Sequence, residues 1–214
     1  LDRRRDYLAA ASGLLVDDLA EMVADWDVGG IARTALADRD GNAGLTAILT
    51  GLGSLSYGEL AGDRIKLGLM LHDPEKEQDR FSDNTHNALY YDQVGLMSVW
   101  NGLYYGLNDK VTEGPSVAMI AAAQAPEAKA AVDARMAETL ERLQLIKDTA
   151  VSGEMAYDQM LAADNPDGNA MLQAAIDGLV AQTRAIEAVA VALDLKIAVK
   201  GSTSLDDPAS VLAQ

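Results

Sequence analysis

Apolar residues recur along most of the chain at steps of three, four and seven, the spacing that gives an α-helix one apolar face. No long run alternates apolar and polar residues as a half-buried strand does. The pattern predicts helices over residues 4–26, 31–37, 42–72, 84–105, 117–124, 126–150, 154–161 and 169–193. We therefore expect an all-α fold, an up-and-down helical bundle in which long helices are joined by short ones.

Turn residues set the predicted ends of these helices. Gly29-Gly30 ends the first helix, and Asp73-Pro74 ends the third, after which a charged loop runs to residue 83. A turn with a helix cap is predicted at 38–42. No linker divides residues 1–195, which we expect to form a single helical domain. The apolar pattern fades after Leu195, so residues 196–214 are predicted to be a loose or extended tail.

Charge limits the classes of partner. The chain has 214 residues, with 33 acidic and 17 basic side chains, and its formal net charge is −16. A chain this acidic repels phosphate backbones, which argues against nucleic acid and against anionic membrane surfaces. No apolar segment is long enough to span a bilayer. With two histidines and no cysteine, a metal site made by this chain alone would rely on oxygen ligands.

A dense polar segment opens the predicted helix 84–105. Ser82 or Asp83 is suited to be its N-cap, but one cap does not explain six consecutive polar residues at 82–87. His86 would lie in the first turn, where the positive end of the helix dipole disfavours imidazolium. A neutral ring there could bind a metal or accept a hydrogen bond. The alternative is a histidine satisfied by capping.

The predicted helix 42–72 holds several interior glycines, each of which costs about 1 kcal/mol relative to alanine. Gly58 and Gly62 lie one turn apart, so we expect another helix to pack closely there, with a kink or a ligand as alternatives. Glu59 falls on the extension of the apolar stripe, where it is either part of a structural ion pair or part of a site. Arg64, five residues further on, could pair with a different helix.

Three stretches resemble a known family, one of them the opening helix from Arg4 to Trp26. Residues 49–55 followed by 58–64 look like the pattern TGLGSL…GELAGER, and residues 73–77 followed by 81–86 look like DPEDEHSCFSDNTH. The chain resembles the imelysin-like family, also called the insulin-cleaving membrane protease or peptidase M75 family, from Arg4 to about Leu195. The G-x-H-x-x-E motif of the family lies in its earlier half and does not occur here, so the chain looks like the later part of such a protein.

The resemblance implies an exported bacterial protein, periplasmic or associated with the outer membrane and lipoprotein-like, although this chain shows no signal peptide. It implies a link to iron acquisition, with iron, another divalent metal or a small ligand as the bound species. The site residues that it implies are Glu59, Arg64, Ser82, Asp83 and His86, with His86 as the metal ligand. An N-terminal half or a partner chain would complete the site.

Two departures from the family pattern bear on that site. Asp63 stands where the family often has glutamate, and Gln78-Asp79-Arg80 replaces the usual His-Ser-Cys, so one histidine of the pattern is absent.

Three functions remain open on this basis. The first is an exported binding protein of metal acquisition that is not catalytic by itself. The second is a metallopeptidase, which needs a metal ligand set and a general base that the G-x-H-x-x-E motif is said to supply. The third is a structural helical module that packs on a partner, in which substitutions at Glu59 and His86 would change stability but no binding property.

Overall fold

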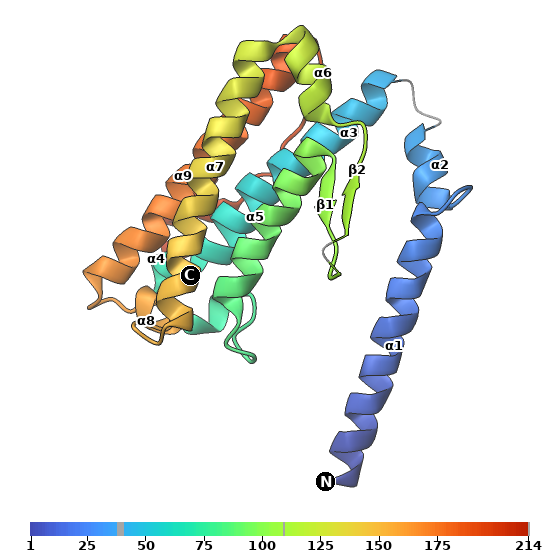
Figure 1. Ribbon diagram of the computed structural model, residues 1–214. Coiled ribbons are helices and arrows are strands. Elements are labelled where there is room, and N and C mark those ends of the chain that lie inside the picture. Colours follow the sequence, from blue (N-terminus) through green and yellow to red (C-terminus); the bar gives the residue numbers. More distant parts are fainter. Residues whose placement is uncertain (38–40, 109, 214) are drawn as a thin grey trace. The chain divides into compact units, whose positions relative to one another are not determined.

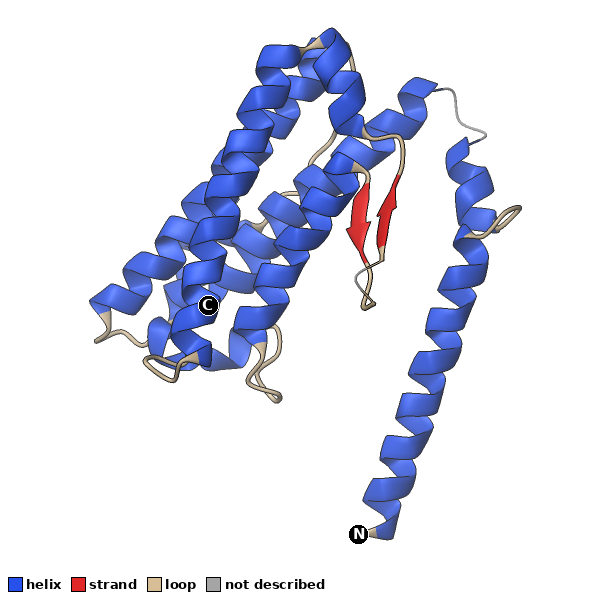
Figure 2. Cartoon of the chain, viewed as in Figure 1, coloured by secondary structure: helices blue, strands red, loops and turns tan. Residues whose placement is uncertain are grey.

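The computed structural model describes residues 1–37, 41–108 and 110–213, and it confirms the predicted all-α bundle (Figures 1 and 2). The α-helices of the described residues are α1 (Asp2–Trp26), α2 (Ile31–Ala37), α3 (Gly41–Ser54), α4 (Leu67–Leu71), α5 (Thr85–Asn101), α6 (Val117–Gln124), α7 (Pro126–Val151), α8 (Tyr157–Leu161), α9 (Pro166–Ala192), α10 (Thr203–Asp206) and α11 (Pro208–Leu212). Of the turn predicted at 38–42, residues 38–40 lie outside the described part.

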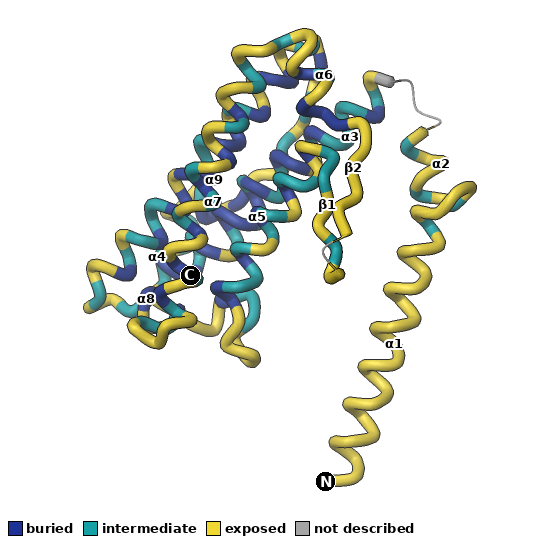
Figure 3. Tube along the Cα trace, viewed as in Figure 1, coloured by how far each residue is buried: buried dark blue, intermediate teal, exposed yellow. Residues whose placement is uncertain are grey.

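Packing divides the chain into two compact units, residues 1–45 and residues 46–214, with the boundary inside α3. The first unit contains α1 and α2, which pack on each other. No residue of α1 is buried, so its predicted apolar stripe is exposed (Figure 3).

The second unit holds the hydrophobic core. Helices α7 and α9 lie side by side, and α5 packs on α7 (Figure 1). Helix α9 also packs on the helical segment Leu55–Lys66, which directly follows α3. Their facing sides bury large apolar side chains, among them Leu60, Leu89, Leu96, Trp100, Met136, Leu143, Ile146, Leu179 and Ile186. The apolar spacing noted in the sequence therefore marks the buried faces of these helices.

The predicted helix 42–72 is one continuous rod, but its centre is wound differently. A π-helix, η1 (Leu55–Lys66), lies between α3 and α4. π-Helices are rare, are usually a single turn, and occur frequently at functional sites. The rod ends at His72, whose left-handed backbone (φ +50°) precedes the short 3₁₀ helix η2 (Pro74–Lys76).

The predicted helix 84–105 was wrong in its last four residues. Helix α5 ends at Asn101 because Gly102 takes a left-handed conformation (φ +62°). Leu103–Tyr105 (β1) then pairs antiparallel with Val111–Glu113 (β2), so that Leu103 lies opposite Glu113. A Cβ on Gly102 would lie 2.7 Å from the carbonyl oxygen of Gly114, so this corner requires glycine.

The C-terminal segment is extended from Lys196 to Ser202 and then forms α10 and α11. It differs from a loose tail in that Ser202 and Ser204 are buried against the π-helix. No helix among the described residues combines the length and the apolar character that crossing a bilayer requires.

Candidate functional site

The glycines of the GELAG motif form a close-packing surface. A Cβ on Gly58 would lie 2.5 Å from the backbone oxygen of Lys200, and one on Gly62 would lie 2.2 Å from the Cβ of Ser202. The close packing expected at these glycines is therefore confirmed. The segment that packs there is an extended stretch of the C-terminal segment, residues 199–202, rather than another helix.

Hydrogen bonds hold this stretch along the π-helix. The backbone N–H of Lys200 donates to Ser54 Oγ at 2.9 Å, and Ser204 Oγ donates to the carbonyl oxygen of Gly62 at 2.9 Å. Ser202 Oγ donates to Asp63 Oδ1 at 2.6 Å. Asp63, at the position where the family often has glutamate, is thus engaged by the protein's own C-terminal segment.

Glu59 lies between two cations. Its Oε1 accepts a hydrogen bond from Lys200 Nζ at 2.6 Å, and its Oε2 lies 3.6 Å from an Arg64 terminal nitrogen. The hydrogen bond from Lys200, helped by the charges of Lys200 and Arg64, lowers the pKa of Glu59 despite partial burial. The same hydrogen bond raises the pKa of Lys200. Glu59 is therefore held ionised in a structural ion pair.

The winding of η1 explains why Arg64 meets Glu59. In an α-helix of 3.6 residues per turn, side chains five positions apart point about 140° away from each other. The i→i+5 bonding of a π-helix closes a wider turn, so such residues lie nearly above one another. The sequence left open a pairing of Arg64 with a different helix, but its ion pair is with Glu59 on the same one.

The second motif surrounds the start of α5. Its N-cap is Asn84, with no side-chain cap hydrogen bond, so the predicted cap at Ser82 or Asp83 was wrong. Both residues are exposed in the preceding turn, where Ser82 Oγ donates to the Asp79 carbonyl oxygen at 3.2 Å. Asp83 has a left-handed backbone (φ +51°), which places it outside the helix.

His86 lies in the first turn of α5, as predicted, and is 9 % exposed. Its Nε2 lies 3.2 Å from Asn87 Nδ2, an amide nitrogen that also donates to Asn84 Oδ1 at 2.8 Å. Because an amide nitrogen can only donate, Nε2 accepts in this contact, which leaves Nδ1 as the other ring nitrogen to be partnered. That Nδ1 is buried and has no hydrogen-bond partner. The Asn87 amide therefore accounts for only one side of this ring, and the ring makes no capping hydrogen bond among the described residues.

Further buried polar atoms lie near this turn. Glu77 is only 7 % exposed, and burial raises its pKa although Thr85 hydrogen-bonds it. The hydroxyl of Tyr157 and Oε1 of Gln78 are buried without partners. Burial and the nearby charge of Glu77 also raise the pKa of Tyr157, which stays a neutral phenol.

The five residues named by the resemblance thus form two groups. Glu59 and Arg64 lie on η1, whereas Ser82, Asp83 and His86 surround the start of α5. Among the described residues, no hydrogen bond or ion pair joins the groups directly. The carboxylate of Asp92, on α5, interacts electrostatically both with Arg64 on η1 and with residues of the loop before α5. Burial raises its pKa, while the Gln78 amide, 3.4 Å away, and the charge of Arg64 lower it.

Within the described ranges, no three His, Asp or Glu side chains gather closely enough to hold a metal ion. The residues that the sequence did not single out are Lys200, Ser202, Ser204 and Asp206. Asp206 accepts hydrogen bonds from the Tyr57 hydroxyl at 2.7 Å and from the Ser202 N–H at 3.0 Å. The sequence held no signal for them, since Lys200 lies 141 positions beyond Glu59.

The domain is an all-α bundle with a π-helix at the GELAG motif and a polar helix start at the motif of residues 81–86. The imelysin family model, peptidase family M75, matches residues 1–186, and the chain belongs to that family. A search of curated proteins finds no matching relative.

Proposed function

We propose that this chain is an exported binding protein of the imelysin family, associated with the acquisition of iron or another metal and not catalytic by itself. Family membership supports the general class. The observation that carries the proposal is the buried, unpartnered ring nitrogen of His86. A buried polar group without a partner costs free energy, so a ligand that meets it gains affinity.

The geometry restricts how His86 would act. A bare metal ion on Nε2 would replace the Asn87 amide and leave Nδ1 without a partner, so the unpartnered nitrogen supports a metal that is carried by an oxygen-bearing chelator. A ligand oxygen would instead accept from Nδ1–H. The exposed side chains Ser82 and Asp83 would supply further oxygen atoms beside the ring. On η1, Glu59 is paired with both Arg64 and Lys200, and Glu59 and Arg64 would contribute only after that pairing rearranges.

Calorimetry on the full chain tests this proposal, with Fe²⁺ under anaerobic conditions and Fe³⁺ supplied as citrate. We expect stoichiometric binding that His86→Ala abolishes. The matched control is His72→Ala, because His72 Nδ1 already has a partner in the carbonyl oxygen of Leu161, 2.7 Å away. Binding that survives His86→Ala would contradict the proposed site, and an absence of binding to the wild-type chain would contradict the proposal itself.

The alternative is a metallopeptidase, which the peptidase name of the matching family favours. It requires a water activated by a metal and a base that is free to take its proton. Insulin digestion by the purified chain, with and without a chelator, separates the two functions. Chelator-sensitive cleavage that His86→Ala abolishes would establish the peptidase. If substitutions at Glu59 and His86 change only thermal stability, the third function, a structural module, gains support.

A further inference from the structure

A cavity lies in the second unit between η1, α9 and the C-terminal helices α10 and α11. Its volume is about 340 Å³, and its walls include the apolar side chains of Ile176, Val180, Leu205 and Pro208. Every lining residue belongs to the second unit, so the lining does not depend on the placement of residues 1–45. Mostly apolar pockets of this size, with a small number of polar groups, are typical binding sites for small molecules.

Two basic side chains also line this cavity, Lys66 from the last turn of η1 and Arg184 from α9. Lys66 Nζ donates to Gln173 Oε1 at 3.1 Å, a neutral partner that leaves the charge uncompensated. Arg184 makes neither a hydrogen bond nor an ion pair with any residue that the structure describes. The other arginines of the second unit each form an ion pair, namely Arg64, Arg80, Arg135 and Arg142. Both cations of the cavity therefore lack an ion-pair partner among the described residues.

One carboxylate adjoins the two cations. Asp177 lines the cavity as well, and its Oδ1 accepts a hydrogen bond from Gln173 Nε2 at 2.8 Å. Gln173 thus bridges Lys66 and Asp177, with its oxygen toward the lysine and its nitrogen toward the carboxylate. Two basic groups and one acidic group leave the described lining positive, in a chain whose net charge is −16. An anion is therefore attracted by direct contact here, whereas the chain as a whole repels it.

The two cations belong to opposite ends of the cavity. Gln173, which holds Lys66, and Arg184 are eleven residues apart on α9, about 16 Å along the helix axis. A helical side chain leans toward the N-terminal end of its helix, so the long side chain of Arg184 can shorten this gap. Ile176 and Val180 lie between the two positions on α9. A ligand that meets both cations therefore needs a negative group at each end and a carbon chain between them.

We propose that this cavity binds an elongated dicarboxylic acid, with one carboxylate on Arg184 and the other on Lys66. The guanidinium offers two parallel N–H donors that match the two oxygens of a carboxylate. The apolar walls take the carbon chain, which inorganic phosphate does not have. Asp177 repels a third carboxylate in the middle, so the site disfavours tricarboxylic acids such as citrate. The proposal does not rest on the metal binding proposed at His86.

A second cavity competes for the Arg184 side chain. Arg184 also borders a cavity of about 330 Å³ whose lining includes Tyr57, Glu187 and Asp206. Its two carboxylates make that cavity unsuited to an anion, and Asp206 accepts a hydrogen bond from the Tyr57 hydroxyl at 2.7 Å. Glu187 lies about one turn beyond Arg184 on α9, and its charge draws the guanidinium toward this second cavity. Glu187→Gln should therefore tighten dicarboxylate binding about two- to fivefold.

Calorimetry on the full chain in metal-free buffer tests the proposal with succinate, adipate and suberate, three dicarboxylates of increasing length. We expect stoichiometric binding that is tightest for one length, and at least about tenfold weaker binding of the monocarboxylate with the same carbon chain. Arg184→Gln should weaken binding about tenfold or more, and Arg184→Lys should recover only part of it, because lysine keeps the charge but loses the paired donors. The matched control is Arg135→Gln, at an exposed arginine of α7 that already has an ion pair, and it should bind as the wild type does.

The Nε–Hε signals of the arginines in NMR spectra locate the ligand. On titration with the tightest-binding dicarboxylate, the signal of Arg184 should shift and that of Arg135 should stay in place. Arg184 is exposed, so Arg184→Gln should leave thermal unfolding unchanged, which separates lost binding from lost folding. The proposal would be overturned by a wild-type chain that binds none of the three acids, by binding that Arg184→Gln leaves intact, or by weaker binding in Glu187→Gln.

Discussion

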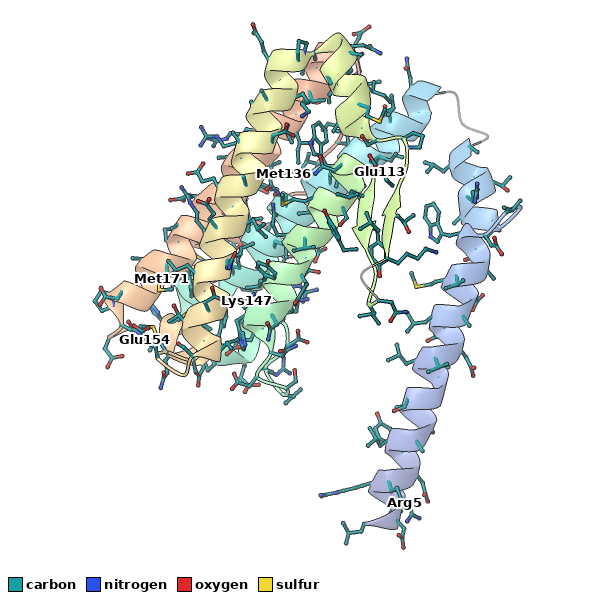
Figure 4. All side chains as sticks on the ribbon, viewed as in Figure 1. Arg5, Glu113, Met136, Lys147, Glu154 and Met171 are labelled. Atoms are coloured by element: carbon teal, nitrogen blue, oxygen red, sulfur yellow. The ribbon has the colours of Figure 1, made fainter. Side chains whose placement is uncertain are left out.

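Gln93 and Gln182 have no solvent exposure and exchange two amide hydrogen bonds, of 2.7 and 3.2 Å, in the centre of the bundle. Gln93 also donates to the carbonyl oxygen of Met136 at 3.2 Å, and Met136 lies on α7 (Figure 4). Gln182 donates to Ser56 Oγ at 3.0 Å, and Ser56 donates to the Leu179 carbonyl oxygen at 3.0 Å. This chain of bonds joins the π-helix η1 to α9, α5 and α7.

Breaking the amide pair on one side should be costly. Gln182→Leu leaves Gln93 and Ser56 with lost partners, and we expect the free energy of unfolding to fall by about 2–4 kcal/mol. Urea unfolding measures it. The double variant Gln93→Leu with Gln182→Leu should lose less than the sum of the two single variants, since both partners are gone. Strict additivity would contradict the pairing. The control Gln144→Leu, at an exposed position of α7, should change stability by about 0.5 kcal/mol or less.

The glycine surface of η1 predicts an asymmetry between two alanine substitutions. Gly58→Ala forces the backbone of Lys200 to move, because the new Cβ would lie 2.5 Å from its oxygen, and we expect a loss of about 1–3 kcal/mol. Gly51→Ala adds a Cβ with nothing within 4 Å and should stabilise the helix by up to about 1 kcal/mol. Urea unfolding compares the variants. Hydrogen exchange of residues 199–206 should accelerate in Gly58→Ala alone, and equal exchange in both variants would count against the packing described.

The ion pair of Glu59 predicts a titration shift. Its pKa is lowered in the folded protein, so this group contributes stability above its unfolded pKa and loses it as the pH falls through the folded value. Lys200→Met should raise the pKa of Glu59, because its strongest hydrogen bond disappears. Carbon NMR of the labelled carboxyl group measures the shift. Lys196→Met, an exposed lysine of the same segment, is the control, and an equal shift in both would exclude a specific pair.

Glu77 predicts the opposite pH dependence. Burial raises its folded pKa, so the folded state binds this proton more tightly than the unfolded chain does. Its contribution to stability is present at acidic pH and is lost as the pH rises from the unfolded pKa through the folded one. Glu77→Gln removes this dependence while keeping an oxygen toward Thr85. The stability of the variant relative to wild type should therefore rise as the pH increases above the unfolded pKa of glutamate, about 4.3. A difference that is independent of pH would show that Glu77 is not perturbed.

The local sequence was enough for most helices. The predicted ranges 31–37 and 117–124 match α2 and α6 residue for residue. Near Ser116 the reason is visible, because its Oγ accepts the Met119 N–H at 3.1 Å and caps α6. The start of α9 was placed three residues late, because Asn165 caps it one residue before Pro166.

The candidate site was only partly predictable. Its motif residues could be named from the resemblance, and the first-turn position of His86 followed from the helix start. The residues with which they pair could not be predicted from the sequence. Lys200 lies 141 positions beyond Glu59, and no local pattern marks a contact across that distance. The same holds for Gln93 and Gln182, polar residues whose burial depends on each other.

The sequence by itself determined the helical class, the positions of most helices and the need for a close neighbour at Gly58 and Gly62, because helix spacing, capping and glycine cost are local properties. Only the tertiary structure decided the π-winding of residues 55–66, the strand pair after Gly102 and the docking of the C-terminal segment. The π-winding and the docked segment involve contacts between residues far apart in the chain, whereas the strand pair joins Leu103–Tyr105 to Val111–Glu113 across a short turn that the helical pattern concealed. The π-helix illustrates the reason, because the two windings differ little in local sequence preference, and packing against residues 199–204 accompanies the one that is observed.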